Sequence, residues 1–149
     1  MAKKDIWSKL KYFGRKENWG DPDKMDECLL LELDQLRYHL QSPLVILCGN
    51  QGKHSKNSYH YIKNGSCAVD LIIPEYKKTP FDLILDVTRF KFTGIGYYPH
   101  WRYKDSLGFG LHLDMRKSKP ARWMGIKDDK GIQKYIELSY ENLIKYGGK

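Results

Sequence analysis

Two histidines and one aspartate in this 149-residue sequence have the residue types and surroundings of a metal site. His60 and Asp70 flank a polar, glycine-containing insert, and His112 lies within Leu111–Asp114, where apolar and polar residues alternate. A polar or charged group among apolar neighbours is costly to bury unless it is paired or bound to a metal. Two imidazoles and a carboxylate suit a catalytic zinc ion, which takes three protein ligands and leaves a fourth position for water. The sequence therefore predicts one Zn²⁺ per chain, held by His60, Asp70 and His112, in a metal-assisted hydrolase.

A second interpretation of the same residues involves no metal. In it His60 is a surface loop residue, and His112 is a core histidine whose hydrogen bonds are satisfied within the protein. Asp114 follows His112 by two residues, so both lie on the same strand face, where Asp114 can orient a ligand imidazole. His100 is a further candidate for the same cleft, whereas His54 is expected at the surface of a loop.

The elements that must position these residues alternate between helices and short strands. Leucines recur at three- and four-residue steps from Met25 to Leu40, which predicts an amphipathic helix that ends before Pro43. Thr79-Pro80 predicts the start of another helix, which continues to about Phe90. Strands are predicted at residues 44–48, 68–73, 94–99 and 109–115.

The rest of the chain has weaker patterns. We expect an N-terminal arm over residues 1–24 with a short helix near 6–13, polar loops at 49–57 and 100–108, and a packed return segment at 120–124. Residues 132–146 are predicted as a helix or an extended tail. The whole is predicted to be one α+β domain, with helices packed on a small, mostly antiparallel sheet.

The chain carries 26 Lys and Arg against 18 Asp and Glu, a net charge of +8. A basic surface attracts polyanions, which include nucleic acid, anionic lipid and anionic cell-wall polymers. The basic residues are dispersed and no known nucleic-acid motif is present, so we expect no nucleic-acid partner.

Three cysteines without a CxxC pair predict reduced, mostly buried thiols and folding in a cytoplasm. No apolar run follows the N-terminal lysines, so no signal peptide is expected. The longest apolar run, Leu44–Cys48, is too short for a transmembrane segment.

Four stretches between residues 25 and 124 have the order of motifs in a known family. They are Leu33–Arg37 with Pro43–Ile46, Ser58–His60 with Gly65 and Ala68–Asp70, Gly94–Pro99, and Leu111–Arg116 with Arg122-Trp123. In these stretches the sequence resembles the zinc D-alanyl-D-alanine carboxypeptidases, peptidoglycan peptidases with a hedgehog-like fold, and most of all their phage and prophage branch. The second stretch is similar to the family's S-x-H-x-x-G-x-A-x-D motif, and the third to its G-x-G-Y-Y-P turn.

The resemblance implies that His60, Asp70 and His112 hold the zinc ion, with Gln51, Ser58, Tyr97 and Tyr98 near the substrate. It implies hydrolysis of D-Ala-containing peptide bonds in peptidoglycan, by a carboxypeptidase or by an endopeptidase of the endolysin type. The expected partners are peptidoglycan stem peptides, and the protein is expected to be a monomer. Such an enzyme, made without a signal peptide, would reach the cell wall after release from the cell or as part of a virion.

The sequence departs from the family in three places. The spacing from His60 to Asp70 is longer, so an insert at 61–64 must bulge from the turn. Phe109 stands where several members carry the acidic general base, which leaves Asp105 or Asp114 for that role, while His100 is a candidate donor to the anionic reaction intermediate. Gln51 lies where an arginine often grips the substrate carboxylate, and an amide cannot form the same charged fork. These departures favour an endopeptidase over a strict carboxypeptidase, or a degenerate member that serves as a structural or wall-binding module.

Overall fold

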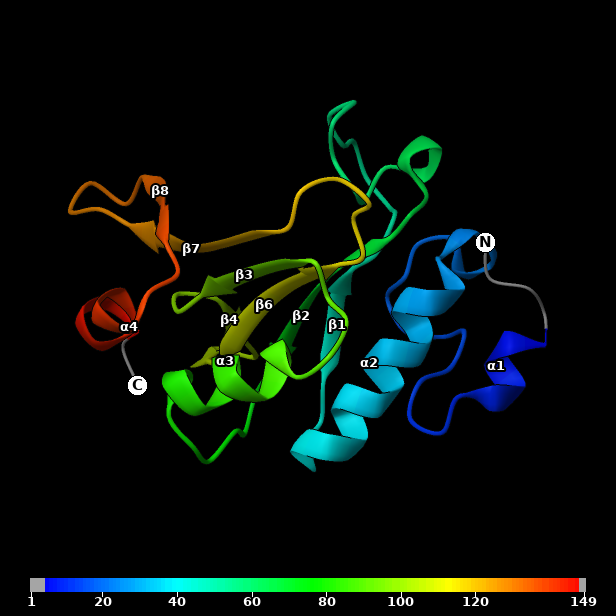
Figure 1. Cartoon of the computed structure of the whole chain (residues 1–149), viewed down its shortest axis with the longest axis horizontal. Coiled ribbons are helices and arrows are strands. Elements are labelled where there is room, and N and C mark those ends of the chain that lie inside the picture. The colour runs from blue at the N-terminus through cyan, green and yellow to red at the C-terminus, as the bar shows by residue number, and fades with distance from the viewer. Residues whose placement is uncertain (1–4, 148–149) are drawn as a thin grey trace.

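A six-stranded sheet forms the centre of the fold (Figure 1). The computed structural model describes residues 5–147. The strands lie in the order β1 (Val45–Cys48), β2 (Ala68–Ile73), β6 (Phe109–Asp114), β3 (Gly94–Tyr98), β7 (Ala121–Lys127) and β8 (Gln133–Glu137). All neighbours are antiparallel except β3 and β7, which are parallel. The predicted α+β class and mostly antiparallel sheet are therefore confirmed, and the sheet is mixed.

Four helices accompany the sheet: α1 (Ile6–Lys9), α2 (Glu27–Leu40), α3 (Pro80–Thr88) and α4 (Tyr140–Tyr146). The Asp26 side chain accepts a hydrogen bond from the Leu29 N–H and caps α2, as short acidic side chains do at helix starts. Thr79 and Asp82 form a reciprocal capping box at the start of α3, with Pro80 in its first turn. Both predicted helices are thus confirmed near the expected residues. No helix within residues 5–147 is long and apolar enough to cross a bilayer.

The core lies between these helices and one face of the sheet. Apolar residues recur at helical spacing in α2 and at every second position in β2 and β6, so each element directs one apolar side to the same interior. The core residues of these three elements are Leu29, Leu30, Leu33, Leu36 and Leu40, then Val69, Leu71 and Ile73, then Phe109, Leu111 and Leu113. The alternate residues of β2 and β6 are consequently displayed on the opposite face.

The strand register aligns a row of residues across that opposite face. Cys48 pairs with Asp70, Asp70 with His112, His112 with Gly96, and Gly96 with Trp123. Residues directly opposite one another on adjacent strands share a face and lie within side-chain reach. The pairing thus brings two of the three predicted zinc ligands together as cross-strand neighbours.

Three segments differ from the prediction. The return segment at 120–124 is part of β7, and the predicted tail at 132–146 forms β8 and α4. The predicted loop at 100–108 contains a hairpin of two short strands, β4 (Arg102–Tyr103) and β5 (Ser106–Leu107). Most residues of β8 are exposed, so this strand has no buried apolar face, which is why its sequence lacks the alternation that predicts strands.

The face of the sheet that carries Asp70 and His112 is the site face. Part of it is fixed by a glycine that lies beneath an indole ring. The ring of Trp123 covers Gly96 so closely that a Cβ atom there would lie 2.6 Å from the Trp123 Nε1 and Cε2 atoms. Trp123 in turn lies beside His112, with ring centroids 5.2 Å apart. Only glycine therefore allows β7 to present its tryptophan next to the candidate ligand.

We expect Gly96→Ala to lower the free energy of unfolding by about 1–3 kcal/mol, because the added methyl group must displace the indole. Urea unfolding of the variant and the wild-type protein measures this difference. Gly14→Ala is the matched control, since a Cβ at residue 14 meets nothing closer than 3.7 Å. Equal stability of both variants would show that the indole is free to move.

Candidate metal centre

Three ligand atoms from separate parts of the chain converge at the centre of the site face. His60 Nε2 lies 3.3 Å from His112 Nδ1 and 3.4 Å from Asp70 Oδ1, and His112 Nδ1 lies 3.1 Å from Asp70 Oδ1. Zinc bonds of about 2.0–2.1 Å in a tetrahedron place neighbouring ligand atoms about 3.3–3.4 Å apart. The three atoms therefore already form a triangle of the size that a zinc ion requires.

The protonation of His112 is set by the residue behind it. Its Nε2 lies 2.8 Å from Asp114 Oδ2, and an ionised carboxylate can only accept a hydrogen bond, so Nε2 carries the proton. Asp114 is fully buried and also accepts a hydrogen bond from Arg116 Nε at 2.9 Å. Hydrogen bonds from Arg116 and His112 outweigh burial and hold the pKa of Asp114 well below its usual range. Nδ1 is consequently the nitrogen of His112 that faces Asp70, and it offers a lone pair there once its own proton is displaced.

His60 is oriented in a similar way by the main chain. Its Nδ1 lies 2.8 Å from the Gly49 carbonyl oxygen, which again only accepts, so Nδ1 carries a proton and Nε2 is the nitrogen directed to the cluster. The Ser58 hydroxyl accepts a hydrogen bond from the backbone N–H of His60. Ser58, predicted near the substrate, thus takes part in shaping the loop that carries His60.

The insert between His60 and Asp70 is accommodated by a short 3₁₀ turn, η2 (Ile62–Asn64). Gly65 ends the turn with a φ of 98°, a conformation that glycine adopts without steric cost. The Cys67 N–H then donates to the Tyr59 carbonyl at 3.0 Å and returns the chain to β2. The extra residues therefore bulge away from the site, as the sequence predicts.

Two imidazoles and a carboxylate that meet at 3.1–3.4 Å need positive charge among them, supplied by protons or by a metal ion. Burial lowers the pKa of His60, but its hydrogen bonds with Asp70, Cys48 and Gly49 outweigh this effect and raise it to about 10. The pKa of Asp70 is held well below its usual range, because hydrogen bonds with both imidazoles exceed the effect of burial. Protons therefore occupy this cluster in the absence of a metal, and a metal ion must displace them. Metal binding is accordingly expected to weaken as the pH falls.

An aromatic group borders the ligands on the side of β3 and β7. Trp123 Nε1 donates to the Tyr98 hydroxyl at 2.9 Å, and Trp101 stacks on the Tyr98 ring with centroids 4.2 Å apart. Burial raises the pKa of Tyr98 to about 12, so its hydroxyl remains neutral and able to donate. Tyr98 thus lies on the site face, two residues along β3 from the glycine opposite His112.

Other predicted site residues lie elsewhere. Tyr97 occupies the opposite face of β3, where it is fully buried and donates to the Gly147 carbonyl, so it belongs to the core and not to the site face. His100 follows the end of β3 and borders a hollow lined also by Leu107 and Tyr146. Burial lowers the pKa of His100, which leaves this imidazole neutral at pH 7.

The two candidate acids differ in their surroundings. Asp105 occupies the exposed turn of the β4–β5 hairpin and belongs to neither of the two groups of metal-ligating side chains found within residues 5–147. Asp114 contacts the cluster through His112, but its carboxylate is fully engaged by that imidazole and by Arg116. Asp114 is thus a positioning residue for His112.

Gln51, predicted to contact the substrate, instead holds the loop after β1. Its Oε1 accepts from the Gly49 N–H at 2.7 Å, and its Nε2 donates to the Asn18 carbonyl at 2.8 Å. Both ends of the amide are therefore occupied by the protein itself.

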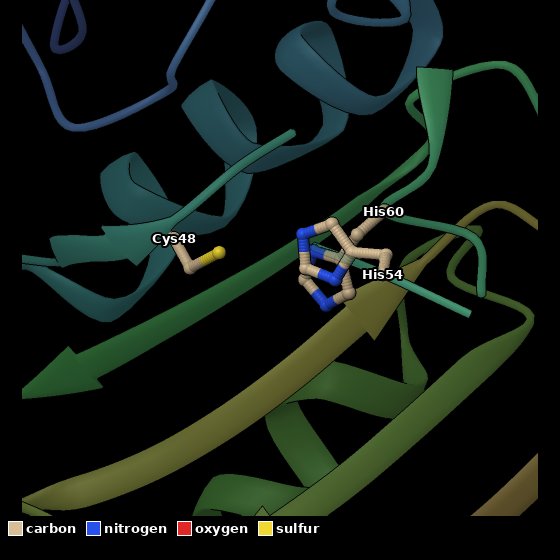
Figure 2. Close-up of side chains that lie close together, drawn as sticks. All are labelled: Cys48, His54 and His60. Carbon is tan, nitrogen blue, oxygen red and sulfur yellow. The ribbon is translucent and has the colours of Figure 1, made fainter. Parts of the chain in front are cut away.

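Sequence reasoning missed two residues that adjoin His60. The His54 ring stacks on the His60 ring with centroids 4.8 Å apart, and Cys48 shares the face of Asp70 (Figure 2). Ligand atoms of Cys48, His54 and His60 all lie within 4.8 Å of one another. One signal in the sequence could have indicated these residues: the 49–57 loop begins directly after Cys48 and ends just before Ser58 and His60.

No family model, curated protein or solved structure matches this chain. The function therefore has to be inferred from the geometry of the site.

We expect Asp114→Asn to weaken zinc binding by about 10–100-fold, because the amide no longer fixes the His112 proton on Nε2. Competition with a chromophoric chelator measures this affinity. Asp105→Asn, at the exposed hairpin turn, is the control and should bind zinc like the wild type. Unchanged affinity in Asp114→Asn, or an equal loss in both variants, would contradict the assigned role of Asp114.

Proposed function

We propose that this protein is a zinc-dependent peptidase that hydrolyses D-Ala-containing peptide bonds of bacterial peptidoglycan, on a hedgehog-like fold. The observation that carries the proposal is the convergence of His60 Nε2, His112 Nδ1 and Asp70 Oδ1 at 3.1–3.4 Å. Each imidazole is oriented by a hydrogen bond on its other nitrogen: His112 by Asp114 and His60 by the Gly49 carbonyl group. These bonds direct His112 Nδ1 and His60 Nε2 toward the cluster. This donor set suits zinc better than the hard, oxygen-preferring divalent ions.

A zinc ion bound to these residues would polarise a scissile carbonyl and lower the pKa of its bound water to about 7. The chain itself supplies the orientation of the ligands. Asp114 holds the imidazole of His112, and the Gly49 carbonyl holds that of His60. Ligands fixed in this way do not have to reorganise when the ion binds, which strengthens binding.

The residues around the cluster support a peptide substrate. Tyr98, Trp101 and Trp123 form an apolar wall that can contact the methyl groups of alanine residues, and the Tyr98 hydroxyl can donate to a carbonyl oxygen. The net charge of +8 favours approach to an anionic wall polymer. Gln51 is bound to Asn18 and offers no substitute for a carboxylate-gripping arginine, which favours an endopeptidase over a carboxypeptidase.

A second candidate function is that of a wall-binding module without catalysis. Phe109, at the position where the resembled family often has its acidic base, packs against Tyr76 with ring centroids 5.3 Å apart and faces the core. The carboxylate of Asp114 is engaged by His112 and Arg116, and Asp105 lies at the exposed hairpin turn outside both groups of metal-ligating side chains. Neither acid is therefore placed as a free proton acceptor beside the cluster.

The test is the release of new amino groups from purified peptidoglycan by zinc-loaded protein. We expect release by the wild type and a loss of at least about a hundredfold in Asp70→Ala, because a metal supplies several kcal/mol of transition-state stabilisation. Asp105→Asn is the control and should retain activity. Circular dichroism checks that each variant is folded.

Sedimentation with insoluble cell walls separates the two candidates. Binding to walls without release of amino groups, by protein that contains zinc, would support the wall-binding module and contradict the peptidase. If the protein neither binds cell walls nor releases amino groups, both candidate functions are excluded.

A further inference from the structure

Cys48, His54 and His60 form a second group of metal-ligating side chains beside the first. Figure 2 shows the sulfur of Cys48 directed toward the two imidazole rings, which overlap in this view. The thiol is half-buried, as is His54, and His60 is almost completely buried. Cys48 and His54 do not belong to the zinc cluster described above, whereas His60 belongs to both groups.

The two groups share His60. The first cluster uses Nε2, which lies 3.3 Å from His112 and 3.4 Å from Asp70. Nδ1 lies 2.8 Å from the Gly49 carbonyl oxygen, and Cys48 Sγ lies 3.6 Å from that same oxygen. Cys48 Sγ is also 3.9 Å from the Gln51 carbonyl oxygen. His54 Nε2 lies 2.6 Å from the same oxygen. The thiol and both imidazoles are thus gathered around the carbonyl groups of Gly49 and Gln51.

We propose that Cys48, His54 and His60 form a binding set for a soft, thiophilic metal cation, and that this set and the zinc cluster exclude each other. A neutral imidazole has one lone pair, on the ring nitrogen that carries no proton. With its proton on Nδ1, His60 serves the zinc cluster through Nε2. With its proton moved to Nε2, it serves the second set through Nδ1 and is lost to the first.

The chemistry of the two sets selects different ions. Thiolate is a soft ligand and favours ions such as Cd²⁺ and Cu⁺, whereas two imidazoles and a carboxylate suit borderline Zn²⁺. Binding at the second set removes the thiol proton of Cys48 to solvent and transfers the His60 proton from Nδ1 to Nε2. No electron transfer is involved. A soft cation therefore removes one ligand from the zinc cluster without entering it.

Cadmium is the probe, because a thiolate bound to Cd²⁺ gives a charge-transfer absorption band in the ultraviolet. Cys28 is exposed on α2 and is replaced by serine in every sample, whereas Cys67 is buried and is kept. We expect Cys28→Ser protein to develop the band with one Cd²⁺ per chain. The further change Cys48→Ser should abolish the band.

Exclusion is tested on zinc-loaded Cys28→Ser protein by equilibrium dialysis against Cd²⁺, with both metals measured by elemental analysis. We expect the zinc content to fall as the cadmium band grows, with the sum of zinc and cadmium constant at one ion per chain. Asp70→Ala should lose zinc affinity by more than about tenfold yet keep the cadmium band, since Asp70 serves only the first set.

Three results would overturn the proposal. These are a band that survives Cys48→Ser, cadmium binding without a band, and simultaneous binding of both metals in one chain. None of these readouts uses peptidase activity, so the test remains valid if peptidoglycan is not the substrate.

Discussion

The site depends on the hydrogen bond between Asp114 and His112. Asp114 is completely buried, and a buried carboxylate is stable only when its oxygens are fully bonded, here by His112 Nε2 and Arg116. The same bond decides which nitrogen of His112 faces Asp70 and His60. One buried interaction thereby turns a neutral side chain into a directed metal ligand. The reason to infer a metal centre is that this nitrogen of His112, His60 Nε2 and Asp70 Oδ1 converge at 3.1–3.4 Å.

The sheet provides the precision that this arrangement needs. Asp70 and His112 are cross-strand partners, and Gly94 and Gly96 lie opposite the polar residues of β6 on the next strand. A Cβ atom on Gly94 would lie 2.2 Å from both carboxylate oxygens of Asp114, so the buried acid has space only because residue 94 is glycine. The core face of the same strands carries leucine, valine and isoleucine, which fixes the register from the other side.

Local sequence patterns predicted the helix α2, the helix α3 and the strands that carry Asp70 and His112. They also predicted that Asp114 shares a face with His112, because this follows from the two-residue repeat of a strand. The same repeat means that Tyr97 and Tyr98 face opposite sides, but only the pairing of Gly96 with His112 decides which one reaches the site.

Contacts between distant residues could not be read from the sequence in this way. The stacking of His54 on His60 depends on how the 49–57 loop folds back, and polar loop residues have no periodicity that encodes it. The exposed strand β8 likewise lacks a buried face and is defined only by its backbone pairing with β7. Long-range register, and not residue type, therefore limited the prediction of the site.

The central claim is that His60, Asp70 and His112 bind one metal ion, and metal content tests it most directly. The wild type, His112→Ala and His39→Ala are purified without chelator, offered zinc, dialysed and measured by elemental analysis. His39 lies on α2 and pairs with Asp86, away from the cluster, so its variant is the control. We expect one zinc per chain in the wild type and in His39→Ala, and loss of zinc in His112→Ala. A wild type that binds no zinc, or a His112→Ala variant that keeps it, would contradict the account.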